Sequence, residues 1–382
     1  MPFQIGSATV DITPRTPCFL AGYAARDHAH EGVNDPLSLR AFYANNGSDE
    51  ALVISADILW FSDEMIAGIS SKLKEEMGIP PLHVQCCGTH THSAPNVHGD
   101  ANAAWVQTVE AQALAATALA KTRAQDVTLY GGRGESRIGI NRRELLPDGS
   151  ITLGFNPDGP NDREVIVFEA RGANGEVVGR LGNFACHGTS LSQRNYVLSG
   201  DWPGPAASQL EADTQGTFLF LNGGAANICP RVDRQEGFEQ IQEMVDEFVG
   251  DVNGVYESLE ALADGDVIVG AEAVLQLPRK QRDVDEGMGK FRQVRIQGLR
   301  IGPLCILAFP GEVFSQTTMA VKDAFPDQVI MVCSYMSGSR AGYVPVAEAY
   351  ETGGYEVRVS SYSEAAEAIL RQGFIDLVGM LK

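Results

Sequence analysis

Apolar strand-like runs and helical segments alternate along the whole 382-residue chain. Short apolar runs rich in β-branched residues are typical of buried strands, and longer segments with apolar residues every three to four positions are typical of amphipathic helices. Several neighbouring strand-like runs are separated only by turns rich in glycine, proline and asparagine, which predicts hairpins between crossovers. The alternation therefore predicts an α/β fold in which mixed β-sheets are layered with helices.

The turn residues and the periodicity locate the individual elements. We expect strands over residues 5–12, 51–59, 82–87, 127–132, 136–141, 165–170, 177–186, 217–221, 267–277, 292–301, 303–309 and 328–333. We expect helices over residues 62–77, 105–123, 238–263, 313–325 and 363–381, and one more that starts near Pro205. Gly78 followed by two prolines is a clear stop signal for the first of these helices.

Charge and cysteine content narrow the range of partners and compartments. The net charge of −20 repels phosphate backbones and anionic lipid, so we expect no nucleic-acid partner. No apolar run is long enough to span a membrane and no signal peptide is visible, so we expect no integral membrane contact. The seven cysteines form an odd, scattered set without a C-x-x-C pair, which favours a reducing, cytoplasmic location.

Two of the seven histidines, His90 and His92, follow the apolar run 82–87 directly. Side chains two apart in an extended segment lie on the same face. Neutral imidazole is a common zinc ligand and acid/base group, so the pair is typical of a metal or proton-transfer site. The alternative is two structural histidines bound to nearby backbone. A second such pair, His28 and His30, lies in a polar loop and is either solvated or part of a substrate-facing lid.

Four apolar runs end in residues that carry chemistry. Ligands in open α/β sheets bind beyond the carboxyl ends of strands, so these residues could share one crevice, although distant strand ends need not meet. Two or three imidazoles and a carboxylate with an open position form a catalytic zinc pattern. The four ends lead to His90 and His92, to His187, to Asn227 and Cys229, and to Glu312.

Several ordered motifs give the chain a family resemblance. They are Thr89–Pro95 (THTHSAP), Asn141-Arg142, His187–Ser190 (HGTS), Ser199–Asp201 (SGD), Cys229–Arg231 (CPR) and Pro310–Glu312 (PGE). With these motifs the chain resembles the catalytic domain of the neutral/alkaline non-lysosomal ceramidase family from residues 6–14 to residues 348–350. The resemblance implies a zinc-dependent amidohydrolase; the best-known members of the family cleave the amide of ceramide.

The resemblance also implies roles for individual residues. His90, His187 and Glu312 are expected to bind one Zn²⁺ ion, and His92 and Arg142 to lie beside it and handle substrate and proton transfer. We further expect Tyr343 to polarise the oxyanion.

The chain departs from the family pattern at two places. Arg340 stands where the family has its fourth zinc ligand, a tyrosine, so either Tyr335 or water completes the shell, or the metal differs. Asn227 and Cys229 replace an aspartate and a serine in the glycine-rich turn. Cys229 is either a nucleophile or a residue that lines the pocket, and Asn227 and Arg340 are candidates for substrate binding.

We expect residues 1–382 to form a single catalytic α/β domain, without the C-terminal β-domain of true ceramidases. The leading hypothesis is a zinc-dependent hydrolase that cleaves an amide or related acyl bond of a small soluble molecule with metal-activated water. One alternative is a lactone or ester hydrolase, or a lyase, that acts on a polar, sugar-like substrate. The other is a non-catalytic relative that binds a ligand without turnover.

Overall fold

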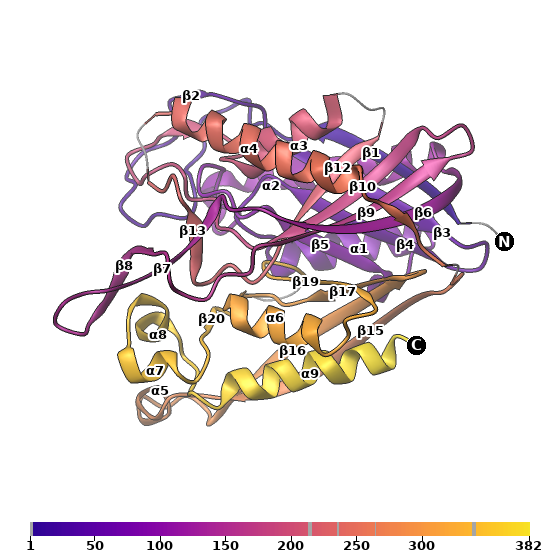
Figure 1. The fold of residues 1–382 in the computed structure, drawn as a ribbon. Coiled ribbons are helices and arrows are strands. Elements are labelled where there is room, and N and C mark those ends of the chain that lie inside the picture. Colours follow the sequence, from indigo (N-terminus) through magenta and orange to yellow (C-terminus); the bar gives the residue numbers. More distant parts are fainter. Residues whose placement is uncertain (1–2, 213–215, 235–236, 264, 338–340) are drawn as a thin grey trace.

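The computed structural model describes residues 3–212, 216–234, 237–263, 265–337 and 341–382. These residues form four layers in the order helices, sheet, sheet, helices, with apolar clusters between adjacent layers (Figure 1). The predicted fold class, mixed sheets layered with helices, is confirmed. The first described residues and the C-terminus lie at the same end of the molecule.

The first sheet is large and mixed. Within the described residues it has nine strands in the order β12-β10-β9-β6-β1-β3-β4-β5, and β14 pairs with β6. The pairs β4–β5 and β10–β12 are parallel, whereas β1–β3 and β3–β4 are antiparallel. The strands are β1 (Gln4–Asp11), β3 (Ser38–Asn45), β4 (Glu50–Ala56), β5 (Val84–Gly88), β6 (Gln125–Glu135), β9 (Glu164–Gly172), β10 (Val177–Phe184), β12 (Thr217–Asn222) and β14 (Glu260–Ala261).

The second sheet packs against one face of the first. Alternate side chains explain how both faces are buried: on β3, Phe42 faces the second sheet, whereas Tyr43 faces the helices on the other side. The order of the second sheet is β15 (Ile268–Pro278), β16 (Phe291–Ile301), β17 (Leu304–Ala308) and β19 (Val329–Cys333).

Amphipathic helices cover the two outer faces. The helices on the first sheet are α1 (Asp63–Met77), α2 (Ala103–Thr122), α3 (Pro203–Ala212) and α4 (Glu239–Tyr256), and those on the second are α6 (Ser315–Asp323) and α9 (Ala366–Met380). Helix α1 begins after Ser62, whose hydroxyl accepts the Met65 N–H, and ends at Gly78 with φ of 80°. Both caps agree with the predicted boundaries.

Further short elements complete the fold. They are β2 (Gly32–Val33) with β11 (Val197–Leu198), β13 (Ile228–Pro230) with β7 (Gly139–Leu145) and β8 (Ile151–Asn156), β18 (Glu312–Val313) with β20 (Tyr343–Val344), and the helices η1 (Pro81–His83), η2 (Asp100–Asn102), α5 (Gln281–Asp285), α7 (Ala349–Thr352) and α8 (Tyr355–Val359).

Two predicted elements were wrong in their extent. The strand predicted over residues 136–141 begins only at Gly139 and continues to Leu145, because it pairs with β8, a strand that the sequence did not indicate. The helix predicted over residues 238–263 ends at Tyr256. The chain then pairs with β6 as β14, because Gly131 and Gly132 leave room there for the side chains of Leu262 and Leu259.

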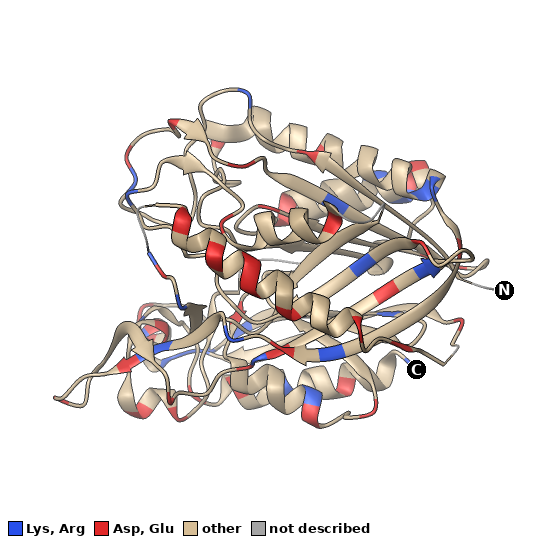
Figure 2. Cartoon of the chain, turned by 45° about the horizontal axis from the view of Figure 1, so that its top comes forward, with Lys and Arg blue, Asp and Glu red and all other residues tan. Residues whose placement is uncertain are grey.

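The surface and the thiols agree with the composition. Figure 2 shows several acidic positions, coloured red, along α4. All seven cysteines are buried free thiols. No helix in the described part of the chain is long and apolar enough to cross a bilayer.

Candidate metal centre

Two loops at strand ends lie side by side and carry the histidines. The segment after β5 forms a parallel bridge from Thr91 to Gly188 in the segment after β10, and the His92 N–H donates to the Gly188 carbonyl at 3.0 Å. Position 188 needs glycine, since a Cβ there would lie 2.6 Å from the His90 carbonyl oxygen. The buried amide of Asn222 joins the loops, donating to the carbonyls of Thr89 and Cys186. Sequence reasoning missed Asn222.

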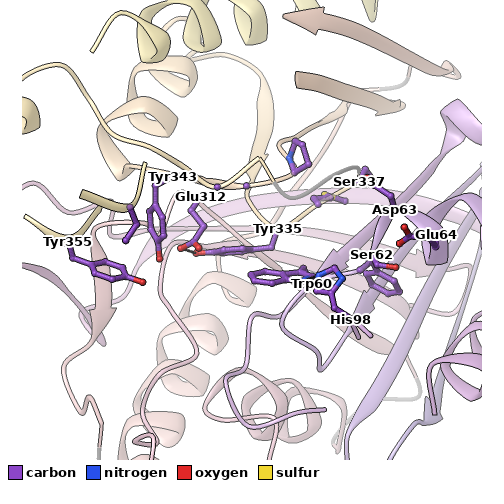
Figure 3. Close-up of a pocket in the computed structure, with 16 residues that line it drawn as sticks. Trp60, Ser62, Asp63, Glu64, His98, Glu312, Tyr335, Ser337, Tyr343 and Tyr355 are labelled. Carbon is purple, nitrogen blue, oxygen red and sulfur yellow. Dashed lines mark hydrogen bonds between the residues drawn. The ribbon is translucent and has the colours of Figure 1, made fainter. Parts of the chain in front are cut away.

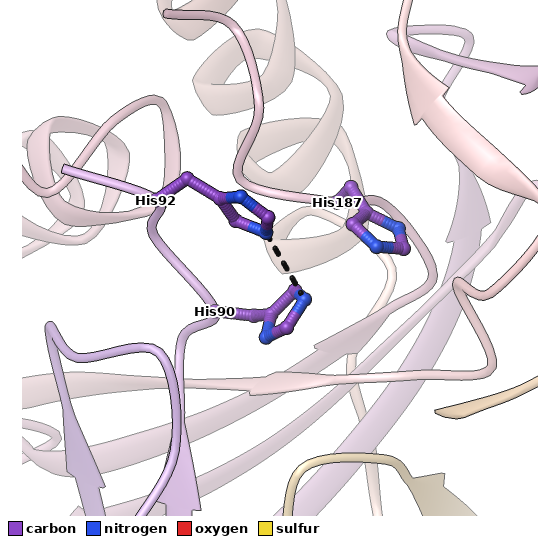
Figure 4. A group of neighbouring side chains, drawn as sticks. All are labelled: His90, His92 and His187. Carbon is purple, nitrogen blue, oxygen red and sulfur yellow. Dashed lines mark hydrogen bonds between the residues drawn. The ribbon is translucent and has the colours of Figure 1, made fainter. Parts of the chain in front are cut away.

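The packing of the two loops brings three imidazoles together. One ring nitrogen from each of His90, His92 and His187 lies within 4.8 Å of the others, a group able to hold a metal ion (Figure 4). The Nε2 atoms of His90 and His92 are 3.3 Å apart. The predicted convergence of these strand ends is therefore confirmed.

Backbone carbonyls fix the tautomers of two of these rings. The Nδ1 atom of His90 is 3.0 Å from the Leu59 oxygen, and that of His187 is 2.6 Å from the Ala225 oxygen. A carbonyl oxygen only accepts, so in both rings Nδ1 carries the proton and Nε2 presents its lone pair. Metal-binding histidines are commonly oriented by such contacts.

The charge state of the rings also suits a metal. Burial lowers the pKa of His90, His92 and His187 well below the ordinary value of 6.5. All three rings are therefore neutral near pH 7, which is the form that binds metal ions.

Glu312 places a carboxylate beside one of these imidazoles. Its Oε2 atom is 3.2 Å from His187 Nε2, so two acceptors face each other in a buried place. Such a contact is unfavourable unless a proton or a cation lies between them. Ligand atoms about 2 Å from a tetrahedral metal are about 3.3 Å from one another, which matches the distance between Glu312 Oε2 and His187 Nε2.

Arg142 on β7 lies beside the imidazoles. Its Nη1 is 3.2 Å from His187 Nε2, and its Nη2 donates to the Tyr343 hydroxyl at 3.3 Å. Its Nε donates to Glu356 at 2.9 Å, and the other oxygen of Glu356 accepts from Arg143 at 2.7 Å. Glu356 is wholly buried and was missed by sequence reasoning, because it lies in a short helix with no motif of its own.

Tyr335 lies against the cluster from the side of the second sheet. Its ring stacks on His90 with centroids 3.6 Å apart, and its hydroxyl is 3.4 Å from Glu312 Oε2. Its backbone has φ of 58°, an uncommon conformation that the surrounding contacts must hold. Arg340, the other candidate at this side, lies outside the described residues.

Asn227 and Cys229 are both buried. The Asn227 amide donates to Ser315 and Gln316 and accepts the Ser315 N–H at 2.8 Å, so it holds the start of α6. Cys229 is buried in β13, and burial raises the pKa of its thiol to about 12. A thiol in that state is a poor nucleophile.

The loop over residues 21–36 covers His92 through Tyr23 and Arg26. The Tyr23 ring lies 5.0 Å from the His92 ring, and Arg26 donates to the His92 carbonyl at 2.6 Å. His28 is exposed between two acidic residues, and His30 accepts the Cys18 N–H at 3.0 Å. The second histidine pair therefore contributes no ring to the cluster.

A cavity of about 470 Å³ opens beside Glu312. Aromatic rings form part of its wall, and Trp60 donates from Nε1 to His98 at 2.8 Å within it. Figure 3 shows the cavity extending from the tyrosines to the first turn of α1. The labelled lining residues are Trp60, Ser62, Asp63, Glu64, His98, Glu312, Tyr335, Ser337, Tyr343 and Tyr355.

Comparisons with known proteins agree with this architecture, although no family model matches the chain. The neutral ceramidase of Pseudomonas aeruginosa is 24% identical over 261 residues, which cover 62% of this chain and 38% of that protein. Neutral ceramidase B of Dictyostelium discoideum is 25% identical over 237 residues, covering 56% of this chain and 32% of that protein. The neutral ceramidase of Oryza sativa is 26% identical over 236 residues, covering 55% and 29%.

These alignments span less than two fifths of the curated relatives. The crystal structure of the Pseudomonas aeruginosa neutral ceramidase superimposes with a TM-score of 0.81 at 19% identity, over 99% of this chain and 74% of that one. A structure titled "Ceramidase complexed with C2" gives 0.81 at 18% identity, over 99% and 75%. The predicted resemblance to the neutral ceramidase family is thus confirmed, and the chain has the fold of the Pseudomonas neutral ceramidase.

Proposed function

We propose that residues 1–382 act as a zinc-dependent hydrolase that cleaves an amide or related acyl bond of a small polar molecule. The observation that carries this proposal is the buried contact between His187 Nε2 and Glu312 Oε2, two acceptors that a cation would satisfy. The similarity to neutral ceramidases, whose name refers to hydrolysis of an amide, supports the reaction class.

The proposed zinc ligands are His90, His187 and Glu312, and the Tyr335 hydroxyl lies near enough to Glu312 to be the fourth. Zinc in such a site supplies a nucleophilic water near neutral pH and polarises a carbonyl oxygen. The protein contributes the tautomers of both histidines, which the carbonyls of Leu59 and Ala225 hold.

The remaining site residues handle protons and charge. His92 is neutral, so its Nε2 can accept a proton from the attacking water and return it to the leaving nitrogen. Arg142 and Tyr343 donate toward the oxygen that becomes negative in the tetrahedral state. Cys229 is proposed as a packing residue, since its buried thiol stays protonated, and Asn227 as a support for α6.

The cavity supports a small substrate. Its volume of about 470 Å³ is in the range of sites for single small molecules, and its wall mixes aromatic rings with carboxylates. We therefore propose a compact amide with polar groups, and not a long-chain lipid, as the substrate.

The test combines metal analysis with one ligand variant. The purified protein should contain one zinc ion per chain and hydrolyse at least one compound in a panel of short N-acyl amides, esters and lactones. His90→Ala should lose the zinc and reduce kcat/KM by about a thousandfold or more. The matched control is His83→Ala, because His83 lies before β5, at the end opposite His90, and its ring hydrogen-bonds the Glu50 carbonyl.

Three outcomes would overturn parts of the proposal. Metal-free protein that hydrolyses the panel as fast as the zinc form would refute the metal. Turnover of esters or lactones alone would refute the amide. Tight zinc binding without turnover of any compound would favour the ligand-binding alternative.

A further inference from the structure

We propose that Glu356 is a positioning residue, which holds the Arg142 guanidinium in the orientation that reaches the reacting carbonyl. This inference rests on the proposed function, because it assigns Arg142 to the oxyanion. Glu356 belongs to α8, more than 200 residues away from Arg142 in the chain, and touches no proposed zinc ligand in the contacts described above.

The two oxygens of the Glu356 carboxylate have separate partners. Oε1 accepts from Arg142 Nε at 2.9 Å, and Oε2 accepts from Arg143 Nη1 at 2.7 Å. The carboxylate is wholly buried, and both arginine side chains are less than a tenth exposed. Charge-assisted hydrogen bonds in such a place are short and strongly directional, so they define the position of each guanidinium.

The two arginines use their other donors differently. Arg143 Nη2 donates to the Gly353 carbonyl at 2.7 Å and to the Thr352 hydroxyl at 3.2 Å, which ties it to the end of α7. Arg142 instead turns its Nη1 and Nη2 toward His187 and Tyr343. Arg143 therefore anchors Glu356 to the protein, and Glu356 in turn orients Arg142.

The charge balance of the three side chains supports these different roles of Arg143 and Arg142. One carboxylate between two guanidinium groups leaves a single positive charge, and the donors of Arg142 that face His187 and Tyr343 direct that charge toward the site. Without the carboxylate, two buried cations would lie next to each other in the sequence and repel, and Arg142 Nε would lose its acceptor. The guanidinium would then move away from the developing negative charge.

The chain offers a matched control in Glu169. This residue is also wholly buried and bridges two arginines, Arg171 and Arg180. Arg180 lies on β10, which ends at Phe184, and His187 follows that end. The four steps from Arg180 to Phe184 alone span about 13 Å in an extended strand. Glu169→Gln therefore removes the same kind of bridge outside the site.

The experiment compares Glu356→Gln with Glu169→Gln in the zinc-loaded protein. Melting temperature, zinc content and steady-state kinetics on the best amide of the panel are measured for each. Binding of methylphosphonate, a tetrahedral anion, is measured by calorimetry. We expect both variants to melt earlier and to keep their zinc. Only Glu356→Gln should lose about tenfold to a hundredfold in kcat with little change in KM, and bind methylphosphonate about tenfold more weakly.

A second pair of variants covers the case in which glutamine prevents folding. Glu356→Asp keeps the negative charge but withdraws it by one methylene, so we expect a loss in kcat of about threefold to tenfold, whereas Glu169→Asp should leave kcat unchanged. Equal kcat values in the two aspartate variants, or unchanged methylphosphonate affinity in Glu356→Gln, would overturn the positioning role. If wild type hydrolyses nothing but Glu356→Gln still weakens methylphosphonate binding, the proposed hydrolase fails while the positioning role stands.

Discussion

Two buried glutamates, Glu169 and Glu356, make the same contacts in different parts of the molecule. Each bridges two arginines. At Glu169 the register of neighbouring strands creates the bridge, because Arg180 is its direct antiparallel partner in the ladder between β9 and β10. At Glu356 the bridge joins β7 to α8, two elements from distant parts of the chain.

The difference lies in what the arginines face on their other side. Arg180 lies over the ring of Tyr256 at 3.7 Å, and Arg171 lies over that of Tyr130 at 4.4 Å, so both charges are covered by aromatic surface. Arg142 faces an imidazole and a phenol at the candidate metal centre. A buried ion pair alone therefore does not indicate a site; the direction of its remaining donors does.

The largest effect that we expect is the loss of stability when the Glu169 cluster loses one of its arginines. Arg180→Met leaves the buried Glu169 carboxylate with only the partly exposed Arg171, so unfolding free energy should fall by about 3–5 kcal/mol, measured by urea denaturation. Arg133→Met, which removes an exposed pair with Glu164, should cost no more than about 1 kcal/mol. A fall in kcat of the folded Arg180→Met protein would break the comparison, since this cluster would then matter to catalysis.

A third buried carboxylate, Asp201, shows how burial changes a carboxyl pKa when the hydrogen-bond partners are backbone N–H groups and not arginines. Its oxygens accept from Ser190, Leu191 and Trp202, and burial raises its pKa from 3.8 to about 6. Between about pH 4 and pH 6 the folded protein keeps a proton that the unfolded chain has lost. This group therefore stabilises the fold most at the acid end, and about 3 kcal/mol is lost as pH rises through that interval.

The measurement is the pH slope of stability in wild type and Asp201→Asn. The variant cannot titrate at this position, so its unfolding free energy should fall less steeply between about pH 4 and pH 6 than that of wild type. The contributions of all other carboxylates cancel in the difference. Parallel curves for the two proteins would mean that Asp201 is ionised throughout this range. Backbone N–H donors would then offset the cost of burying a charged carboxylate as well as arginines do.

The sequence predicts residues that follow a local pattern, but not residues whose burial depends on packing between distant elements. His90, His92 and His187 each follow an apolar run, and runs that end at one edge of a sheet leave their next residues together, so the cluster was predictable. The layered α/β class was predictable for the same periodic reasons. Glu356 was not, because its burial depends on how α8 packs against β20 and β8 and meets the arginines of β7, and no local pattern encodes those contacts.

The smallest effect concerns the far end of Arg142. Tyr343→Phe keeps the ring but removes the hydroxyl that accepts from Arg142 Nη2 at 3.3 Å. Burial raises the pKa of this hydroxyl well above its ordinary range, so it stays protonated and can itself donate to an oxyanion. We expect kcat to fall about tenfold, or about 1.4 kcal/mol, with KM nearly unchanged.

The matched control is Tyr256→Phe, which keeps the ring beneath Arg180 in the other cluster. Its melting temperature can change with the loss of a buried hydroxyl, but its kcat should equal that of wild type. If Tyr343→Phe also leaves kcat unchanged, the phenol only packs against Arg142, and the oxyanion would have to be stabilised by the guanidinium without it. Combining Tyr343→Phe with Glu356→Gln then separates the two contacts: if both act only through the orientation of Arg142, the double variant should lose little more than Glu356→Gln alone.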